Sequence, residues 1–213
     1  MNVVPDVSAD HQTDTPPADI AGYKGDPALG AYTTLRLGGP AGTLTVVSDP
    51  DEAVATVRNA TALGQPVLVL AGGSNVVVAD AGFPGLVLLL RTRGIRPVEI
   101  GTGEVVLRVA AGEPWDDFVA HAVTNGYSGV ECLAGIPGST GATPIQNVGA
   151  YGQEVAHTIA AVHAYDREQD AVRVLSPAEC GFGYRTSVFK HNDRYANPHS
   201  GSDSTRRSSS RRS

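Results

Sequence analysis

The sequence has few residues of the kinds that form cross-links or membrane spans. It contains two cysteines, Cys132 and Cys180, far apart and without a Cys-x-x-Cys pair, which argues against a disulfide framework and fits a reducing compartment. Its longest apolar run, residues 85–90, is far shorter than the roughly 20 residues of a membrane helix. The first 30 residues show no basic start followed by an apolar stretch. We therefore expect a cytoplasmic protein that does not enter a membrane.

Positive charge is also scarce. The formal net charge is −6, and the residues from Ala196 onward carry +3, so the body of the chain carries −9. A protein that binds nucleic acid needs a basic face, so this balance argues against that class. The six histidines include no His-x-x-x-His pair, and no cysteines have ligand spacing. We expect no metal site.

Composition divides the 213 residues into four regions. Residues 1–28 are acidic and proline-rich without an apolar period, which is typical of a disordered leader. Residues 29–130 and 131–195 contain the periodic apolar segments of a folded protein. Residues 196–213 contain seven serines, four arginines and one apolar residue, so we expect a disordered tail.

Two helices are predicted from their end signals. Asp49, Pro50 and Glu52 supply an N-cap, a proline at the first helical position and an acid three residues after the cap, and Gly64 ends the helix. A second helix begins at Pro114 and ends at Gly126. Apolar runs predict the strands 43–47, 67–70, 76–78, 86–90 and 105–110, a hairpin of 158–165 with 171–175, and then a capped turn at 176–179. This mixture indicates an α+β fold.

Two glycine-rich loops are the most informative segments. Residues 71–75, Ala-Gly-Gly-Ser-Asn, follow an apolar strand as phosphate loops do, although they match neither standard nucleotide motif. Residues 135–152 contain five glycines and no charge. Glycines let backbone N–H groups approach an anion closely, so such loops suit a pyrophosphate. Considered alone, the second loop is equally consistent with a set of structural turns.

Together with residues 33–41 and the segment from Cys180 to Lys190, these loops form an ordered set that resembles the UDP-N-acetylenolpyruvoylglucosamine reductase family, also called UDP-N-acetylmuramate dehydrogenases. The resemblance runs from Tyr32 to Tyr195. It implies a two-lobed FAD-binding domain of the flavin-dependent reductase and oxidase type, with residues 29–130 as the first lobe and 131–195 as an incomplete second lobe. It also implies NADPH as hydride donor, a UDP-sugar bearing an enolpyruvyl group as substrate, and a role in peptidoglycan synthesis and hence in cell shape and division.

The resemblance assigns residues to this chemistry. The FAD pyrophosphate is expected on Gly72, Gly73, Ser74 and Asn75, facing Ile136, Pro137, Gly138, Ser139 and Gly141. The residues expected along the flavin are Gln146, Asn147, Gly149 and Ala150. Arg185 matches the catalytic arginine of the family, whose guanidinium stabilises the substrate carboxylate and the developing enolate. The competing interpretation of Arg185 is a surface ion pair.

The sequence also departs from the family. Family members continue into a third, substrate-binding domain with a proton-donating serine and a late glutamate, and we find neither segment here. The arginine-rich tail suggests a shifted reading frame as its origin. The resemblance therefore leaves open whether this chain turns over. Two alternatives are an FAD-binding fragment without catalysis and an FAD-dependent oxidase of the same fold.

Overall fold

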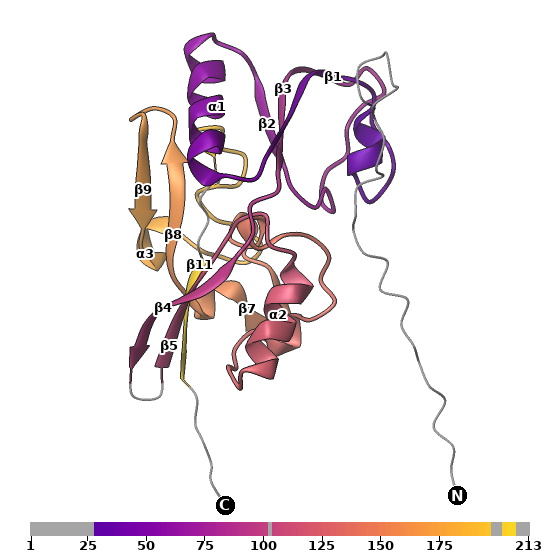
Figure 1. Ribbon diagram of the computed structural model, residues 1–213. Helices are drawn as coiled ribbons and strands as arrows, with labels where there is room; N and C mark the ends of the chain where they lie inside the picture. Colours follow the sequence, from indigo (N-terminus) through magenta and orange to yellow (C-terminus); the bar gives the residue numbers. More distant parts are fainter. Residues whose placement is uncertain (1–27, 102–103, 197–201, 208–213) are drawn as a thin grey trace, which may run out of the picture.

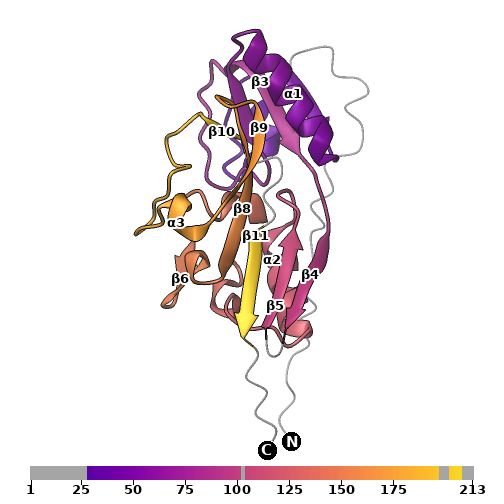
Figure 2. The same ribbon diagram turned by 90° about the vertical axis from the view of Figure 1, so that its left-hand side faces the viewer.

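The strands are divided between two main sheets in the computed structural model, which describes residues 28–101, 104–196 and 202–207 (Figure 1). The first sheet is parallel, in the order β1-β3-β2. The second is antiparallel, in the order β10-β8-β11-β5-β4, with β9 on the other edge of β8 (Figure 2). The strands are β1 (Ala41–Val47), β2 (Val67–Leu70), β3 (Phe83–Leu90), β4 (Ile95–Gly101), β5 (Glu104–Val109), β6 (Gly149–Ala150), β7 (Gln153–Glu154), β8 (Ile159–Asp166), β9 (Ala171–Leu175), β10 (Tyr195–Ala196) and β11 (Ser202–Arg207). This architecture is the expected α+β class.

The helices follow their predicted end signals. They are α1 (Pro50–Ala62), α2 (Trp115–Thr124) and α3 (Pro177–Cys180), with single 3-10 turns η1 (Leu29–Tyr32), η2 (Glu131–Leu133), η3 (Thr140–Ala142) and η4 (Val155–His157). The Asp49 carboxylate accepts from the N–H of Glu52 at 2.9 Å, which confirms the N-cap of α1. Trp115 of α2 is buried and donates to the Leu133 carbonyl at 2.8 Å, so it belongs to the core. Within the described residues, no helix combines the length and apolar character needed to cross a membrane.

One predicted strand is wrong and one strand was missed. Residues 76–78 form no strand and lie in the irregular segment between β2 and β3. Val78 is buried there by packing alone. Sequence analysis did not find β4, which contains Pro97 and an irregular register next to it. A proline is tolerated because β4 lies at the edge of its sheet.

The chain changes sheet between β3 and β4, and the division into lobes at residue 130 stays a prediction. The structure differs from the expected tail, because residues 202–207 form β11 between β5 and β8. A strand ladder joins backbone groups, and β5 and β8 each offer an edge here, so pairing does not require apolar side chains. The leader, apart from Ala28, and the remainder of the tail after Ala196 lie outside the described residues.

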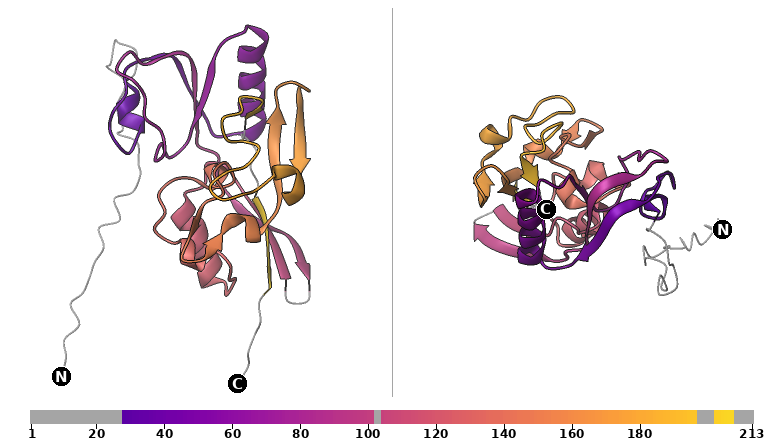
Figure 3. Two further views of the ribbon diagram at one scale, coloured as in Figure 1. Left: turned by 180° about the vertical axis from the view of Figure 1, so that it is seen from behind. Right: turned by 90° about the horizontal axis from the view of Figure 1, so that it is seen from above.

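An apolar cluster connects the two sheets. Its buried members come from β1, β3, α1, β8, β10 and the segment after β5: Val47, Ala53, Val54, Val57, Leu88, Leu90, Ala111, Tyr165 and Ala196. Figure 3 shows the resulting arrangement, in which α1 lies beside the end of the β8–β9 hairpin that carries its turn. Full burial of a side chain such as leucine contributes about 1.5–3 kcal/mol. This cluster therefore contributes substantially to holding the two sheets together.

The turn between β8 and β9, residues 166–170, is built around a buried carboxylate. Asp166 accepts from Nη2 of Arg194 at 2.6 Å, and from the N–H groups of Glu168 and Gln169 at 3.0 and 3.2 Å. The hydrogen bond from Arg194 holds the pKa of Asp166 below its usual range, against the opposing effect of burial. Because the pKa is lower in the folded than in the unfolded protein, the pair stabilises the fold above the unfolded pKa of about 3.9, and this contribution is lost as pH falls through the folded pKa.

We predict that Asp166→Asn lowers the free energy of unfolding at neutral pH by about 1–3 kcal/mol, because it replaces the charged, two-oxygen acceptor of the Arg194 guanidinium by a neutral amide with one acceptor oxygen. Denaturant titrations at a series of pH values measure this, and the deficit should shrink as wild-type Asp166 becomes protonated. Glu168→Gln is the matched control, because Glu168 pairs with the same arginine at 3.0 Å but is 66 % exposed. A deficit that is equal at every pH would contradict the prediction.

Candidate functional site

The first glycine loop, residues 71–75, follows the carboxyl end of β2 in the parallel sheet. Ligands of parallel sheets usually bind at this end of the strands. Gly73 has φ +62°, and a Cβ there would lie 2.1 Å from the Tyr32 carbonyl oxygen. A Cβ on Gly72 would lie 3.0 Å from Cα of Gly138 in the second glycine loop. The lack of a side chain at Gly72 therefore lets the two loops approach closely, whereas Gly73 approaches the backbone at Tyr32.

Hydrogen bonds connect the same two loops. The Ser74 hydroxyl donates to the Pro137 carbonyl at 2.9 Å, and the Asn75 amide donates to Oε1 of Gln146 at 2.9 Å. Both contacts join residues more than sixty positions apart in the chain. Two segments that sequence analysis singled out separately thus form one surface.

This surface offers hydrogen-bond donors to an anion. Among the described residues, the backbone N–H groups of Gly72, Gly73, Ser74, Gly138 and Ser139 donate to no other group of the protein. Ser139 is only 3 % exposed, and its hydroxyl oxygen is buried without a hydrogen-bond partner. Buried polar atoms normally have partners. Unused donors on close-packed glycine loops fit a pyrophosphate.

Asn147 has a structural role in this site. Its side chain is buried, donates to Glu154 at 2.9 Å and to the Gly183 carbonyl at 3.0 Å, and accepts from the N–H of Ala156 at 3.1 Å. These bonds occupy the amide with protein partners. Asn147 therefore holds the second glycine loop against the segment that contains Gly183, instead of presenting its amide to a ligand.

Arg185 lies beside the end of the second loop. Its guanidinium donates to the carbonyls of Asn147 and Gly149, and lies 3.7 Å from the Glu154 carboxylate. The Tyr184 ring is 5.2 Å from the guanidinium carbon. The Arg185 side chain remains 39 % exposed, so an incoming carboxylate can reach it. Arg185 therefore forms the ion pair that the competing interpretation expects, with Glu154, and it also lies beside the second glycine loop.

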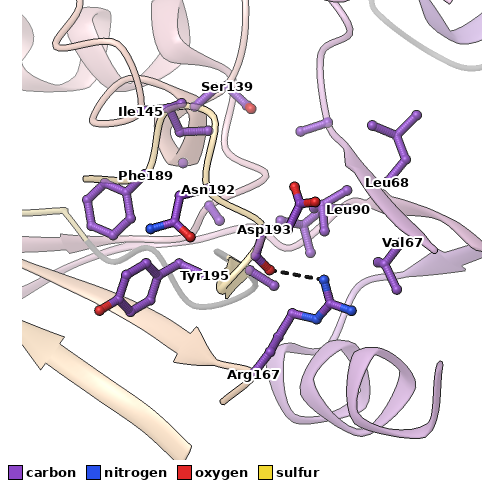
Figure 4. Close-up of a pocket in the computed structure, with 16 residues that line it drawn as sticks. Val67, Leu68, Leu90, Ser139, Ile145, Arg167, Phe189, Asn192, Asp193 and Tyr195 are labelled. Atoms are coloured by element: carbon purple, nitrogen blue, oxygen red, sulfur yellow. Dashed lines mark hydrogen bonds between the residues drawn. The ribbon is translucent and has the colours of Figure 1, made fainter. Parts of the chain in front are cut away.

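A cavity of about 240 Å³ adjoins both loops (Figure 4). The loops contribute Ala71, Ser139, Gly141, Ala142 and Ile145 to it. Its other lining residues are Val67, Leu68, Val69, Leu90, Ala111, Arg167, Phe189, Asn192, Asp193, Tyr195 and Ala196. Sequence analysis missed Arg167, Asn192 and Asp193, because no motif marks them and only the pairing of β10 with β8 places them here.

The remaining predicted site residues take different positions. The side chains of Ile136 and Ala150 pack against the core of the second sheet, which leaves their backbone for any contact with a ligand. The N–H of Gly141 already donates to the Ala111 carbonyl at 2.8 Å, although the residue borders the cavity. Within the described part of the chain, no group of histidine, cysteine, aspartate or glutamate is arranged to hold a metal ion.

Comparison with known proteins gives a consistent result. The model of a family described as FAD binding domain matches residues 42–174. A protein of Salinispora arenicola (strain CNS-205), named UDP-N-acetylenolpyruvoylglucosamine reductase, is 58 % identical over 78 % of this chain and 46 % of its own length. A protein of the same name from Thermobifida fusca (strain YX) is 56 % identical over 78 % of this chain and 47 % of its own. The chain thus spans a little under half the length of these relatives.

Solved structures agree with the fold. A UDP-N-acetylenolpyruvylglucosamine reductase from Thermus caldophilus matches with a TM-score of 0.61 and 33 % identity, over 85 % of this chain and 59 % of that one. A solvent-stable cholesterol oxidase matches with a TM-score of 0.55 and 13 % identity, over 85 % of this chain and 36 % of that one. The second likeness shows a shared fold alone.

We predict that Gly72→Ala weakens FAD binding about tenfold, because its Cβ pushes the two glycine loops apart by a few tenths of an ångström and misplaces their donors. Titration followed by flavin fluorescence measures the affinity. Gly126→Ala is the control: it imposes a positive φ on alanine where nothing lies within 4 Å, so it tests general destabilisation away from the loops. Equal FAD affinity in wild type and Gly72→Ala would contradict the prediction.

Proposed function

The chain belongs to the UDP-N-acetylenolpyruvoylglucosamine reductase family and contains its FAD-binding domain, and from this premise we propose that it acts in the FAD-dependent reduction of an enolpyruvyl UDP-sugar to UDP-N-acetylmuramate. NADPH is the proposed hydride donor, and cytoplasmic peptidoglycan synthesis is the proposed setting. The observation that carries the proposal is the convergence of the two glycine loops and Arg185 on one site. Because the relatives are about twice as long, the complete reaction remains a proposal for this chain.

The two glycine loops are the proposed FAD site. Gly72, Gly73 and Ser74 would hold the pyrophosphate from one side, and Gly138 and Ser139 from the other. Their unused N–H groups and the Ser139 hydroxyl support this assignment. Gln146 and the backbone from Asn147 to Ala150 would lie along the flavin ring. Bound FAD supplies the hydride transfer that amino-acid side chains cannot perform.

Arg185 is the proposed catalytic residue. A guanidinium stays charged at every physiological pH and can bind a carboxylate through two parallel hydrogen bonds. In the proposed reaction it binds the carboxylate of the enolpyruvyl group and stabilises the negative charge that develops there when hydride reaches the adjacent double bond. The carbonyls of Asn147 and Gly149 orient the guanidinium before the substrate arrives. Glu154 would then be displaced from, or share, the same guanidinium.

A second candidate function is FAD binding without turnover by this chain. The matching family model favours it, because it describes an FAD-binding domain over residues 42–174 and names no reaction. One experiment separates the candidates: the protein is reconstituted with FAD, and NADPH oxidation is followed with and without the enolpyruvyl UDP-sugar. Oxidation that depends on the sugar supports the reductase. Stable FAD binding without oxidation assigns the second function, and an absence of FAD binding contradicts both.

We predict that Arg185→Ala leaves FAD affinity unchanged and slows reduction of the UDP-sugar by at least about 10²-fold, because it removes the group that stabilises the developing charge. The reduced, FAD-loaded protein is mixed with the sugar without oxygen, and flavin absorbance is followed through a single turnover. Arg96→Ala is the control, because it removes an exposed arginine of β4 that lines neither the glycine loops nor the cavity. An unchanged rate in Arg185→Ala would refute the assignment.

A further inference from the structure

The turn 166–170 of the β8–β9 hairpin contacts helix α1, which packs on the parallel sheet. Nε of Arg167 donates to the Thr61 hydroxyl at 2.9 Å, and Nε of Arg58 donates to the Asp170 carboxylate. The buried Tyr165 hydroxyl also donates to Asp170, at 2.7 Å. The turn is thus attached to α1 at two points, across the apolar cluster that connects the sheets.

The same turn contacts the wall of the cavity. Nη1 of Arg167 donates to the Asp193 carbonyl at 3.0 Å, a bond drawn in Figure 4, and the Arg167 N–H donates to the Arg194 carbonyl at 2.9 Å. Arg167, Asp193 and Ala196 all line the cavity, which Val67 and Leu68 of β2 border from the first sheet. The Arg167 guanidinium therefore joins α1 to the cavity wall around Asp193.

We propose that Arg167 is a positioning residue for FAD: by holding α1 and the segment around Asp193 at a fixed separation, it sets the width of the cavity beside the two glycine loops. The inference rests on the proposed binding of FAD. Five residues of the glycine loops line this cavity, namely Ala71, Ser139, Gly141, Ala142 and Ile145, so a change in its width moves the loops relative to each other. A dinucleotide that contacts both loops then loses part of its contacts.

The shape of the arginine side chain matters for this role. The guanidinium is planar, so its Nε and Nη1 donors point toward two acceptors at a fixed separation. Thr61 and Asp193 are those acceptors; Thr61 lies on α1, which packs on the first sheet, and Asp193 lies in the segment before β10 of the second sheet. A lysine ammonium lacks this fork and satisfies one acceptor at a time. Arg167→Lys should therefore keep the charge and lose the fixed spacing.

Helix α1 offers a matched pair of variants. The Thr61 hydroxyl donates to the Val57 carbonyl at 2.8 Å and accepts from Arg167, whereas the Thr56 hydroxyl donates to the Glu52 carbonyl at 2.8 Å within the helix. Thr61→Val and Thr56→Val remove the same intrahelical bond and keep the same side-chain shape. Only Thr61→Val removes the bond to Arg167, so the difference between the two variants isolates that bond.

The first measurement uses FAD and the full 213-residue chain. We expect Thr61→Val to raise the Kd for FAD about tenfold relative to Thr56→Val, measured at a temperature where both FAD-free proteins are fully folded. Arg167→Lys should have the same effect as Thr61→Val, and the double variant should be no weaker than either single variant, because both remove one connection. Equal Kd values for Thr61→Val and Thr56→Val would overturn the proposal, as would additive effects in the double variant.

The second measurement does not require FAD. Amide hydrogen exchange of the FAD-free proteins should be faster at Arg167 and around Asp193 in Thr61→Val than in Thr56→Val, because the Arg167 N–H is bonded to that segment. Unchanged exchange overturns the proposed positioning role. Failure of the wild-type chain to bind FAD would instead contradict the proposed function, and the exchange result would still decide whether Arg167 holds the cavity wall.

Discussion

The site depends on a close approach of two backbones. Gly72 and Gly138 lie where a side chain on either would meet the opposite loop, and Ser74 and Asn75 bond across the same contact. Such an approach leaves N–H groups on both loops facing one space, and the low charge of the loops means that backbone dipoles, not lysine or arginine side chains, would stabilise an anion there. The remaining structure has to hold these loops at that distance.

Two separate sheets provide that support. The first loop extends from β2 of the parallel sheet, whereas the second follows α2, which packs on the antiparallel sheet. Their relative position therefore depends on what joins the sheets: the apolar cluster around Tyr165, and the polar contacts of the turn 166–170 with α1. Apolar burial is strong but non-directional, whereas hydrogen bonds fix distances. The buried Asp166 carboxylate supplies such directional bonds at the base of this turn, because it accepts from two backbone N–H groups of the turn and from Arg194.

Local signals predicted much of the fold. The caps of α1, the ends of α2 and the β8–β9 hairpin depend on residues close together in sequence, and the structure confirms them. Residues 76–78 show the limit of that reasoning: their apolar character suits a strand, but the structure uses Val76 and Val78 for packing in an apolar cluster and pairs none of the three residues. β4 and β11 were missed for the opposite reason, because backbone pairing forms each strand without a strong apolar pattern. Pairing is a property of the whole sheet, which a short window of sequence does not contain.

The site shows the same distinction between composition and geometry. Glycine content identified both loops, yet Asn147 illustrates what composition alone cannot assign. Its amide is suited to a flavin ring, but Glu154, Gly183 and Ala156 occupy it, and its contribution is to place the carbonyl that Arg185 contacts. A polar residue next to a ligand loop can thus serve the ligand or the loop, and only its partners decide which. By this criterion Ser139, buried and without a partner, is the side chain that most directly indicates a bound polar group.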